Sequence, residues 1–237
     1  MKDVFQFKQF TVAQNQCAMK VGTDGVLLGA WTPLNNPNSI LDIGTGTGLI
    51  ALQLAQRSDA QLIDAIEIDD EAYEQCVENF ENSPWSDRLF CYHASFEEFV
   101  EEIDDRYDLI VSNPPFFSET QKSGNESRDK ARFLEALPFE ELISGVSQLL
   151  EQNGIFSVII PRKEEAHFIA IASNYKLFPN NICRVKGNEK SEEKRSLIAF
   201  ARTNTTPKTD TVIIETSRHK YTKDYINLVR DFYLKMD

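Results

Sequence analysis

An asparagine and two prolines follow an apolar run directly, a combination that can prepare an amino group for alkylation. The run is Tyr107 to Val111, and Ser112 to Phe116 comes after it. An exocyclic amino group is a weak nucleophile because its lone pair is delocalised into the neighbouring π system. Two fixed carbonyl acceptors on its hydrogens can orient it so that the lone pair becomes available. Asn113 offers a side-chain carbonyl and Pro114 a main-chain carbonyl, and Phe116 offers a flat face on which a base can stack.

A glycine-rich turn forms a second candidate site. The apolar run Ser39 to Ile43 leads into three glycines at alternate positions, Gly44 to Gly48, and Asp42 stands two residues before the first of them. Glycine lacks a Cβ, so bare main chain can approach a ligand here. Glu67 ends the next apolar run about 20 residues later, where a carboxylate can accept hydrogen bonds from ribose hydroxyls.

The spacing of the glycines separates two classes of ligand. A dinucleotide fingerprint has the form G-x-G-x-x-G, whereas this turn has the form G-x-G-x-G. The turn with its preceding acid resembles the S-adenosylmethionine site of the Rossmann-like methyltransferases. The tetrad Asn113 to Phe116 resembles the motif that adenine-N6, guanine-N2 and glutamine-N5 methyltransferases share. A nicotinamide-binding oxidoreductase is therefore disfavoured, and N-methylation of an amide or a base amine is favoured.

Length and composition narrow the class of protein further. The 237 residues, 41% of them hydrophobic, can form one domain with a sizeable core. No apolar run approaches the ~18 residues of a membrane span, and no secretory signal opens the chain, so we expect a cytoplasmic protein. The scattered cysteines and histidines show no metal-ligand spacing, and no metal is expected. The net charge of −12 means that an RNA substrate would need a local basic patch.

Alternating apolar and amphipathic segments predict an α/β fold with a doubly wound, mostly parallel sheet. The absence of a helix between the last long strands predicts a C-terminal antiparallel hairpin, and extended segments at 5–7, 10–12 and 17–21 predict a small N-terminal β-hairpin appended to the sheet. Strands are expected at 39–43, 62–67, 88–92, 107–112, 154–160, 178–186, 196–201 and 211–215, and helices at 26–31, 47–57, 70–82, 96–103, 136–151, 162–174 and 222–235.

Several blocks along the whole chain resemble the bacterial tRNA1(Val) adenine-N6 methyltransferases. The resemblance implies a Rossmann-like methyltransferase fold, S-adenosylmethionine as cofactor, and methylation of the adenine next to the anticodon, position 37, in a tRNA substrate. We expect a monomer with a methyltransferase domain over 39–237 and an extension of a β-hairpin and a capping helix over 1–38. The blocks are Phe7–Phe10, Cys17–Gly25, Leu27–Trp31, Leu41–Gly44, Ser83–Trp85, Asn113–Pro115 and Phe232–Leu234.

The resemblance also assigns residues to the two ligands. Phe116 stands where relatives often have tyrosine, which keeps the stacking face and loses a hydroxyl. Ser95 stands where relatives often carry an aspartate, so we expect a weaker contact to the adenine of the cofactor. The residues placed at the cofactor are Lys20, Gly22, Thr23, Asp24, Asp42, Gly44, Gly46, Glu67, Ile68, Ser95 and Asn113, and those at the target base are Asn113, Pro114, Pro115 and Phe116.

Three stretches could supply the basic patch: 122–132, 186–195 and 218–223. We predict that cations of the first two gather near the mouth of the pocket and bind RNA phosphates. These residues are Arg128, Lys130, Arg132, Lys194 and Arg195.

Other functions stay open at this level. A protein glutamine-N5 or rRNA guanine-N2 methyltransferase would use the same N-P-P-F motif, and the acidic charge mildly favours a protein substrate. The N-terminal blocks favour the tRNA family. A non-catalytic RNA-binding module is a further alternative, against which the intact Asn113 to Pro115 argues.

Overall fold

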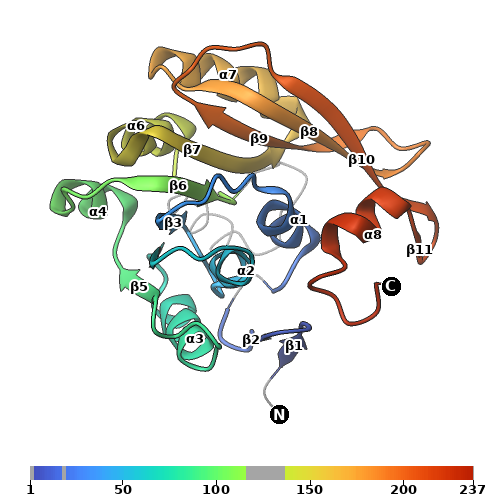
Figure 1. The fold of residues 1–237 in the computed structure, drawn as a ribbon, viewed down its shortest axis with the longest axis horizontal. Helices are drawn as coiled ribbons and strands as arrows, with labels where there is room; N and C mark the ends of the chain where they lie inside the picture. The colour runs from blue at the N-terminus through green and yellow to red at the C-terminus, as the bar shows by residue number, and fades with distance from the viewer. Residues whose placement is uncertain (1–2, 18–19, 116–136, 237) are drawn as a thin grey trace, which may run out of the picture.

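One mixed sheet organises the fold. The computed structural model describes residues 3–17, 20–115 and 137–236. The strands of the sheet lie in the order β11-β10-β8-β9-β7-β6-β3-β4-β5 (Figure 1). Their bounds are β3 (Ser39–Ile43), β4 (Leu62–Glu67), β5 (Leu89–His93), β6 (Tyr107–Ser112), β7 (Leu150–Pro161), β8 (Phe178–Asn188), β9 (Glu193–Ala201), β10 (Lys208–Ser217) and β11 (Lys220–Tyr221).

The strand directions bring both candidate motifs to one edge. β5, β4, β3, β6 and β7 are parallel neighbours, and β9 runs antiparallel to both β7 and β8. This arrangement confirms the predicted mostly parallel sheet with an antiparallel hairpin near its end. The glycine turn after β3, Glu67 at the end of β4 and Asn113 after β6 all lie at the carboxyl ends of the strands, where ligands bind in open α/β sheets.

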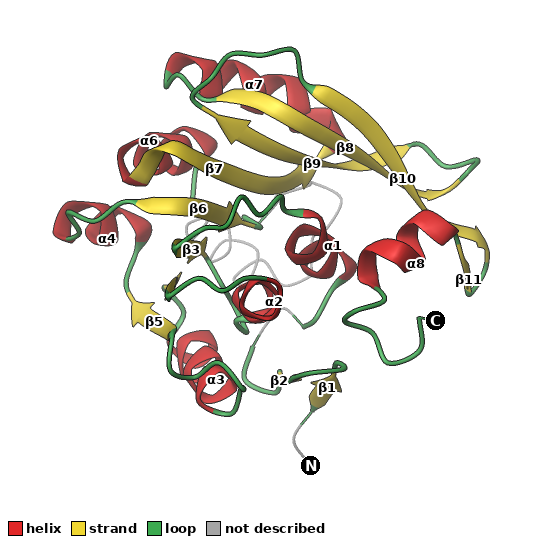
Figure 2. Cartoon of the chain, in the orientation of Figure 1, coloured by secondary structure: helices red, strands yellow, loops and turns green. Residues whose placement is uncertain are grey.

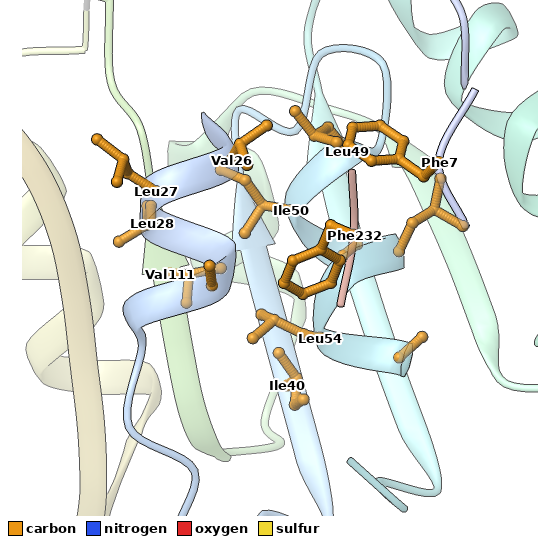
Figure 3. Packing of buried hydrophobic residues seen from close by; sticks show 14 of the residues in the cluster. Phe7, Val26, Leu27, Leu28, Ile40, Leu49, Ile50, Leu54, Val111 and Phe232 are labelled. Atoms are coloured by element: carbon orange, nitrogen blue, oxygen red, sulfur yellow. The ribbon is translucent and has the colours of Figure 1, made fainter. Parts of the chain in front are cut away.

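Helices cover both faces of the sheet (Figure 2). α1, α2, α3 and α8 contribute to one apolar cluster, and α4, α6 and α7 to the other. Neighbouring residues of one strand enter different clusters, as Ile40 and Leu41 of β3 do, so the central strands are apolar on both faces. Figure 3 shows Val26, Ile50 and Leu54 packed between α1, α2 and the sheet. The helix bounds are α1 (Thr23–Trp31), α2 (Leu49–Arg57), α3 (Asp70–Glu81), α4 (Phe96–Glu102), α6 (Phe139–Leu149), α7 (Glu165–Asn174) and α8 (Lys223–Val229), with a 3-10 turn η1 (Arg162–Glu164) before α7.

The N-terminal hairpin differs from the prediction in its strands and its place. β1 (Val4–Gln6) pairs antiparallel with β2 (Thr11–Ala13), and the two form a sheet of their own. The prediction of a strand over 17–21 was wrong for its described residues, which belong to no strand. The reason is a side-chain contact: Gln14 Oε1 accepts a hydrogen bond from Val21 N–H at 2.8 Å in place of a ladder partner.

Several helices and strands begin or end at residues other than those predicted, because of how they pack and pair with the rest of the fold. β7 begins directly after α6, so the predicted helix 136–151 ends two residues early, and residue 136 lies outside the described part. β10 is longer than predicted because it pairs with β8 from Lys208 onward. The predicted helix 222–235 ends at Val229 because the chain turns there, burying Phe232, whose carbonyl accepts a hydrogen bond from Lys8 N–H.

The contact between α4 and α6 depends on a glycine. A Cβ at Gly145 would lie 2.4 Å from Cε1 of Phe96, which is buried, and 3.0 Å from Cγ2 of Val100. Gly145→Val should therefore destabilise the fold by ~2 kcal/mol or more through overpacking, measured by urea unfolding. Gly187→Val is the matched control, because among the described residues a Cβ there meets only Ser191 Oγ, at 3.6 Å. Equal unfolding midpoints for the two variants would contradict this packing.

Candidate active site

The chain turns sharply after β3 because its glycines adopt left-handed conformations. The φ angles of Gly44, Gly46 and Gly48 are +68°, +58° and +80°. The N–H groups of Gly44 and Thr45 both donate to the carbonyl of Ile66, at 3.0 and 3.1 Å. Among the described residues, no atom lies within 4 Å of where a Cβ at Gly44 or Gly46 would stand. The main chain therefore borders open space that a ligand can occupy.

Gly48 has a packing role instead. A Cβ at this position would lie 2.5 Å from Cε1 of Phe80 and 3.0 Å from Sγ of Cys76, both on α3. The start of α2 thus packs directly on α3.

Glu67 fastens the turn to the end of β4. Its Oε2 accepts a hydrogen bond from Gly46 N–H at 2.8 Å, and its Oε1 accepts from Ile68 N–H at 2.9 Å and Asp69 N–H at 3.0 Å. Three main-chain donors fix the carboxylate in one orientation. An ionised carboxylate has about four lone-pair sites, so the donors of the described residues leave one acceptor site for a ligand hydroxyl.

Asp42 lies buried beneath the turn and joins it to α2. Its Oδ2 accepts from Thr45 Oγ1 at 2.7 Å and from Ala51 N–H at 3.2 Å, and its Oδ1 has no hydrogen-bond partner within the described residues. Burial raises the pKa of Asp42 to about 7, although the bonds from Thr45 and Ala51 act in the opposite direction. The structure thus places this predicted cofactor residue behind the turn.

Asn113 emerges beside the glycine turn. Ile43 and Ser112 are paired in neighbouring strands, and Ser112 Oγ donates to the carbonyl of Ile43 at 3.0 Å. The next residues are Gly44 on one strand and Asn113 on the other, so the two motifs start about 5 Å apart. The side chain of Asn113 is half-buried, Pro114 is buried and Pro115 is exposed. Phe116, Arg128, Lys130 and Arg132 lie outside the described residues.

The block before α1 is tied to other elements by ion pairs. Gly22 precedes the helix, and Thr23 and Asp24 form its first turn. The carboxylate of Asp24 pairs with the guanidinium of Arg195 on β9 at 2.7 Å, and Lys20 pairs with Asp3. A predicted cofactor residue and a predicted RNA contact therefore bind each other, while the neighbouring Lys194 is exposed.

Ser95 begins a helix. Its Oγ accepts from Glu98 N–H at 3.2 Å, while its own N–H and O–H donate to the Glu98 carboxylate at 3.0 and 2.8 Å. This capping box explains serine at the start of α4. Ile68, predicted at the cofactor, is 55% exposed at the same edge, and the ring of His93 lies 3.1 Å from its carbonyl.

Sequence reasoning missed two buried polar residues of α3. Gln75 and Asn79 are 0% and 3% exposed and contact the N-terminal segment. They stand four positions apart, so they lie on one face of the helix. Two polar residues at this spacing, on a helix face that would normally be apolar, were the sequence signal that could have revealed this contact.

One hollow in the described part of the chain lies away from this edge. It has a volume of about 140 Å³ and is lined by Pro33, Asn36, Asp108 and Asn153, near the amino ends of β6 and β7.

No three His, Cys, Asp or Glu residues in the described ranges are grouped to hold a metal ion. Within the same ranges, every helix is too short or too polar to cross a membrane.

Comparisons with known proteins agree with this geometry. Residues 20–177 match the family model of the methyltransferase small domain. Relatives named tRNA1(Val) (adenine(37)-N6)-methyltransferase occur in Flavobacterium psychrophilum, 63% identical over 98% of this chain and 100% of the relative, and in Flavobacterium johnsoniae, 60% identical over the same shares. The chain belongs to this methyltransferase family.

Solved structures support the fold alone. A predicted O-methyltransferase from Agrobacterium tumefaciens has a TM-score of 0.69 at 20% identity, covering 88% of this chain and 96% of the other. The ribosomal protein L11 methylase of Lactobacillus delbrueckii has a TM-score of 0.58 at 16% identity, covering 81% and 84%. The predicted Rossmann-like methyltransferase fold is confirmed.

Asp42 should make stability depend on pH in a defined direction. Its folded pKa of about 7 exceeds the ordinary 3.8, so between these values the folded protein binds the proton more tightly than the unfolded chain. The stabilisation that this proton supplies is fully present below the unfolded pKa of 3.8, and it is lost as pH rises through the folded pKa of about 7.

Asp42→Asn removes the titration and keeps the shape of the side chain. The unfolding free energy of the wild type relative to this variant should therefore fall by about 1 kcal/mol per pH unit between about pH 5 and pH 7. Urea unfolding of both proteins across this range measures the difference. A difference that stays constant with pH would contradict the buried carboxyl.

Proposed function

We propose that the protein transfers a methyl group from S-adenosylmethionine to N6 of adenine 37, next to the anticodon of tRNA1(Val). The observation that carries the proposal is full-length identity of 60–63% to relatives named for this reaction. We further propose that it acts as a monomer in the cytoplasm.

The residues at the carboxyl edge fit the cofactor. The open main chain at Gly44 and Gly46 can accommodate the ribose and the amino-acid tail without a pyrophosphate. The spare acceptor site of Glu67 suits a ribose hydroxyl, and the exposed side chain of Ile68 offers an apolar contact for adenine. When bound, S-adenosylmethionine supplies an electrophilic methyl group on sulfur.

Asn113 and Pro114 would prepare the nucleophile. The side-chain carbonyl of Asn113 and the main-chain carbonyl of Pro114 accept the two hydrogens of the adenine amino group. The prolines fix both acceptors before the reaction, so little reorganisation is needed when charge develops. The amine proton can leave after transfer, and no histidine base is required. Phe116 is proposed to stack on the base once it has left the RNA stack.

Incorporation of methyl groups into RNA tests the function directly. Tritiated S-adenosylmethionine is incubated with the protein and total tRNA that lacks the modification, and the labelled nucleoside is then identified. We expect label in N6-methyladenosine of tRNA1(Val). Label in guanosine, or only in a protein added as substrate, would replace the proposal with guanine-N2 or glutamine-N5 methylation.

Asn113 should act mainly in the transition state. Loss of such an interaction typically costs ~3 kcal/mol, so Asn113→Ala should lower the single-turnover rate about 100-fold or more. The affinity for S-adenosylmethionine should change little, because the other residues assigned to the cofactor, among them the glycine turn after β3 and Glu67 on β4, are unchanged. Asn153→Ala is the control, since Asn153 is exposed near the opposite edge of the sheet. A folded Asn113→Ala protein with near-normal turnover would remove Asn113 from the catalytic role.

Lys194 should contribute to RNA binding at this edge. Arg195 is neutralised in part by Asp24, so the exposed Lys194 is the described residue of the predicted patch best placed to meet phosphate. Lys194→Glu should weaken tRNA binding several-fold and lower the salt slope by about 1, measured by filter binding at several salt concentrations.

Lys208→Glu is the matched control for this charge reversal. Lys208 is exposed at the start of β10, which lies at the amino edge of the sheet because β10 runs parallel to β8. Equal effects of the two reversals would show that only total charge matters, and would contradict a patch at the carboxyl edge.

A further inference from the structure

We propose that Gln75 and Asn79, here called the polar clamp, are positioning residues: Asn79 joins the N-terminal hairpin to the glycine turn, and Gln75 holds the segment that follows the hairpin against α3. Through this clamp, cofactor binding and docking of the hairpin stabilise each other. The inference rests on the proposed cofactor site at the turn, and it assigns a role to two residues outside that site.

The amide of Asn79 bonds to two separate main-chain segments. Its Oδ1 accepts from Ala13 N–H at 2.8 Å, and its Nδ2 donates to the carbonyls of Ala13 at 3.0 Å and Thr47 at 2.8 Å. Both of its N–H donors and its carbonyl are therefore used. Ala13 ends β2, and Thr47 lies between the last two glycines of the turn. One buried side chain thus holds the hairpin and the turn together.

Gln75 provides a second point of attachment one helical turn earlier. Its Oε1 accepts from Gln16 N–H at 3.3 Å, and its side chain is fully buried. Between the two attachment points, Gln14 accepts from Val21 N–H, which connects this stretch to the residues just before α1. The clamp therefore also positions the approach to Gly22, Thr23 and Asp24.

The hairpin depends on such contacts because its strands pair only with each other in the described part of the chain, apart from a single bridge between Phe7 and Tyr233. Aromatic packing of Phe7 and Phe10 holds its outer part. Aromatic packing sets distance loosely, whereas paired hydrogen bonds set position and register. The end of β2 is thus located by the clamp.

The clamp links the two events thermodynamically. The turn is bonded to Asn79 through Thr47, and Asn79 is bonded to the hairpin through Ala13. If the cofactor favours the docked hairpin through this chain of bonds, the docked hairpin must favour cofactor binding by the same factor, because coupling between binding equilibria is reciprocal.

Hydrogen exchange of the main-chain N–H groups of Ala13 and Gln16 measures this coupling. S-adenosylhomocysteine, the demethylated cofactor, should slow exchange of both amides in the wild type. In Asn79→Ala the slowing should be lost, and the Kd for S-adenosylhomocysteine should rise ~10-fold or more, since the N–H of Ala13 and the carbonyls of Ala13 and Thr47 each lose a partner. The rate at saturating S-adenosylmethionine should stay near that of the wild type, which separates positioning from catalysis.

Two further variants keep the test decisive. Asn82→Ala removes an exposed amide that donates to Glu78 O from the same helix at 2.7 Å, and it should leave exchange and affinity unchanged. Gln75→Ala removes only the weaker attachment, so it tests the clamp if Asn79→Ala does not fold. It should abolish the slowing at Gln16 and leave most of it at Ala13.

The outcomes that would overturn the clamp differ from those that would overturn the cofactor site. If the wild type binds S-adenosylhomocysteine and neither amide slows, if Asn79→Ala binds it normally, or if Gln75→Ala keeps the slowing at Gln16, the coupling is wrong while the site stands. If the wild type binds no S-adenosylhomocysteine, the site itself fails, and the clamp falls with it.

Discussion

The hydrogen bonds of the Glu67 carboxylate hold the glycine turn against the end of β4, and the arrangement of the carboxyl edge of the sheet depends on them. A turn with three left-handed glycines has few main-chain partners of its own, and Glu67 supplies an acceptor for Gly46 while also binding the first two N–H groups after β4. The turn is thereby tied to the neighbouring strand by side-chain as well as main-chain bonds. Because Gly44 and Gly46 carry no side chains, the main chain at these two positions can be approached by a ligand.

Strand order places the two proposed ligand sites side by side. β3 lies between β4, which ends at Glu67, and β6, which leads into Asn113, so the acceptors proposed for a cofactor ribose and for an amino group arise at the ends of adjacent strands. The bond from Ser112 to Ile43 holds the two strand ends in register just before they diverge. Asp42 supports the turn from behind, and Asn79 supports it from α3.

The central strands and the glycine turn could be predicted because their signals are local. β3, β4 and β6 match the predicted 39–43, 62–67 and 107–112, since apolar runs end there at glycine, acid or Asn-Pro. Contacts between distant segments could not be predicted. Asn79 and Ala13 are 66 residues apart, and Arg195 and Asp24 are 171 apart. The false strand at 17–21 has a more local origin, because the N–H of Val21 bonds to the side chain of Gln14 in place of a ladder partner.

Calorimetric titration of the wild type and Glu67→Gln with S-adenosylhomocysteine and with NAD tests the central claim most directly. Glutamine keeps one carbonyl acceptor and turns an NH₂ group toward main-chain donors, so the turn loses part of its support and the ribose loses an acceptor. The wild type should bind S-adenosylhomocysteine and not NAD, and the variant should bind it ~10-fold more weakly or worse. Heat from NAD alone, or equal affinity in both proteins, would contradict the cofactor site described here.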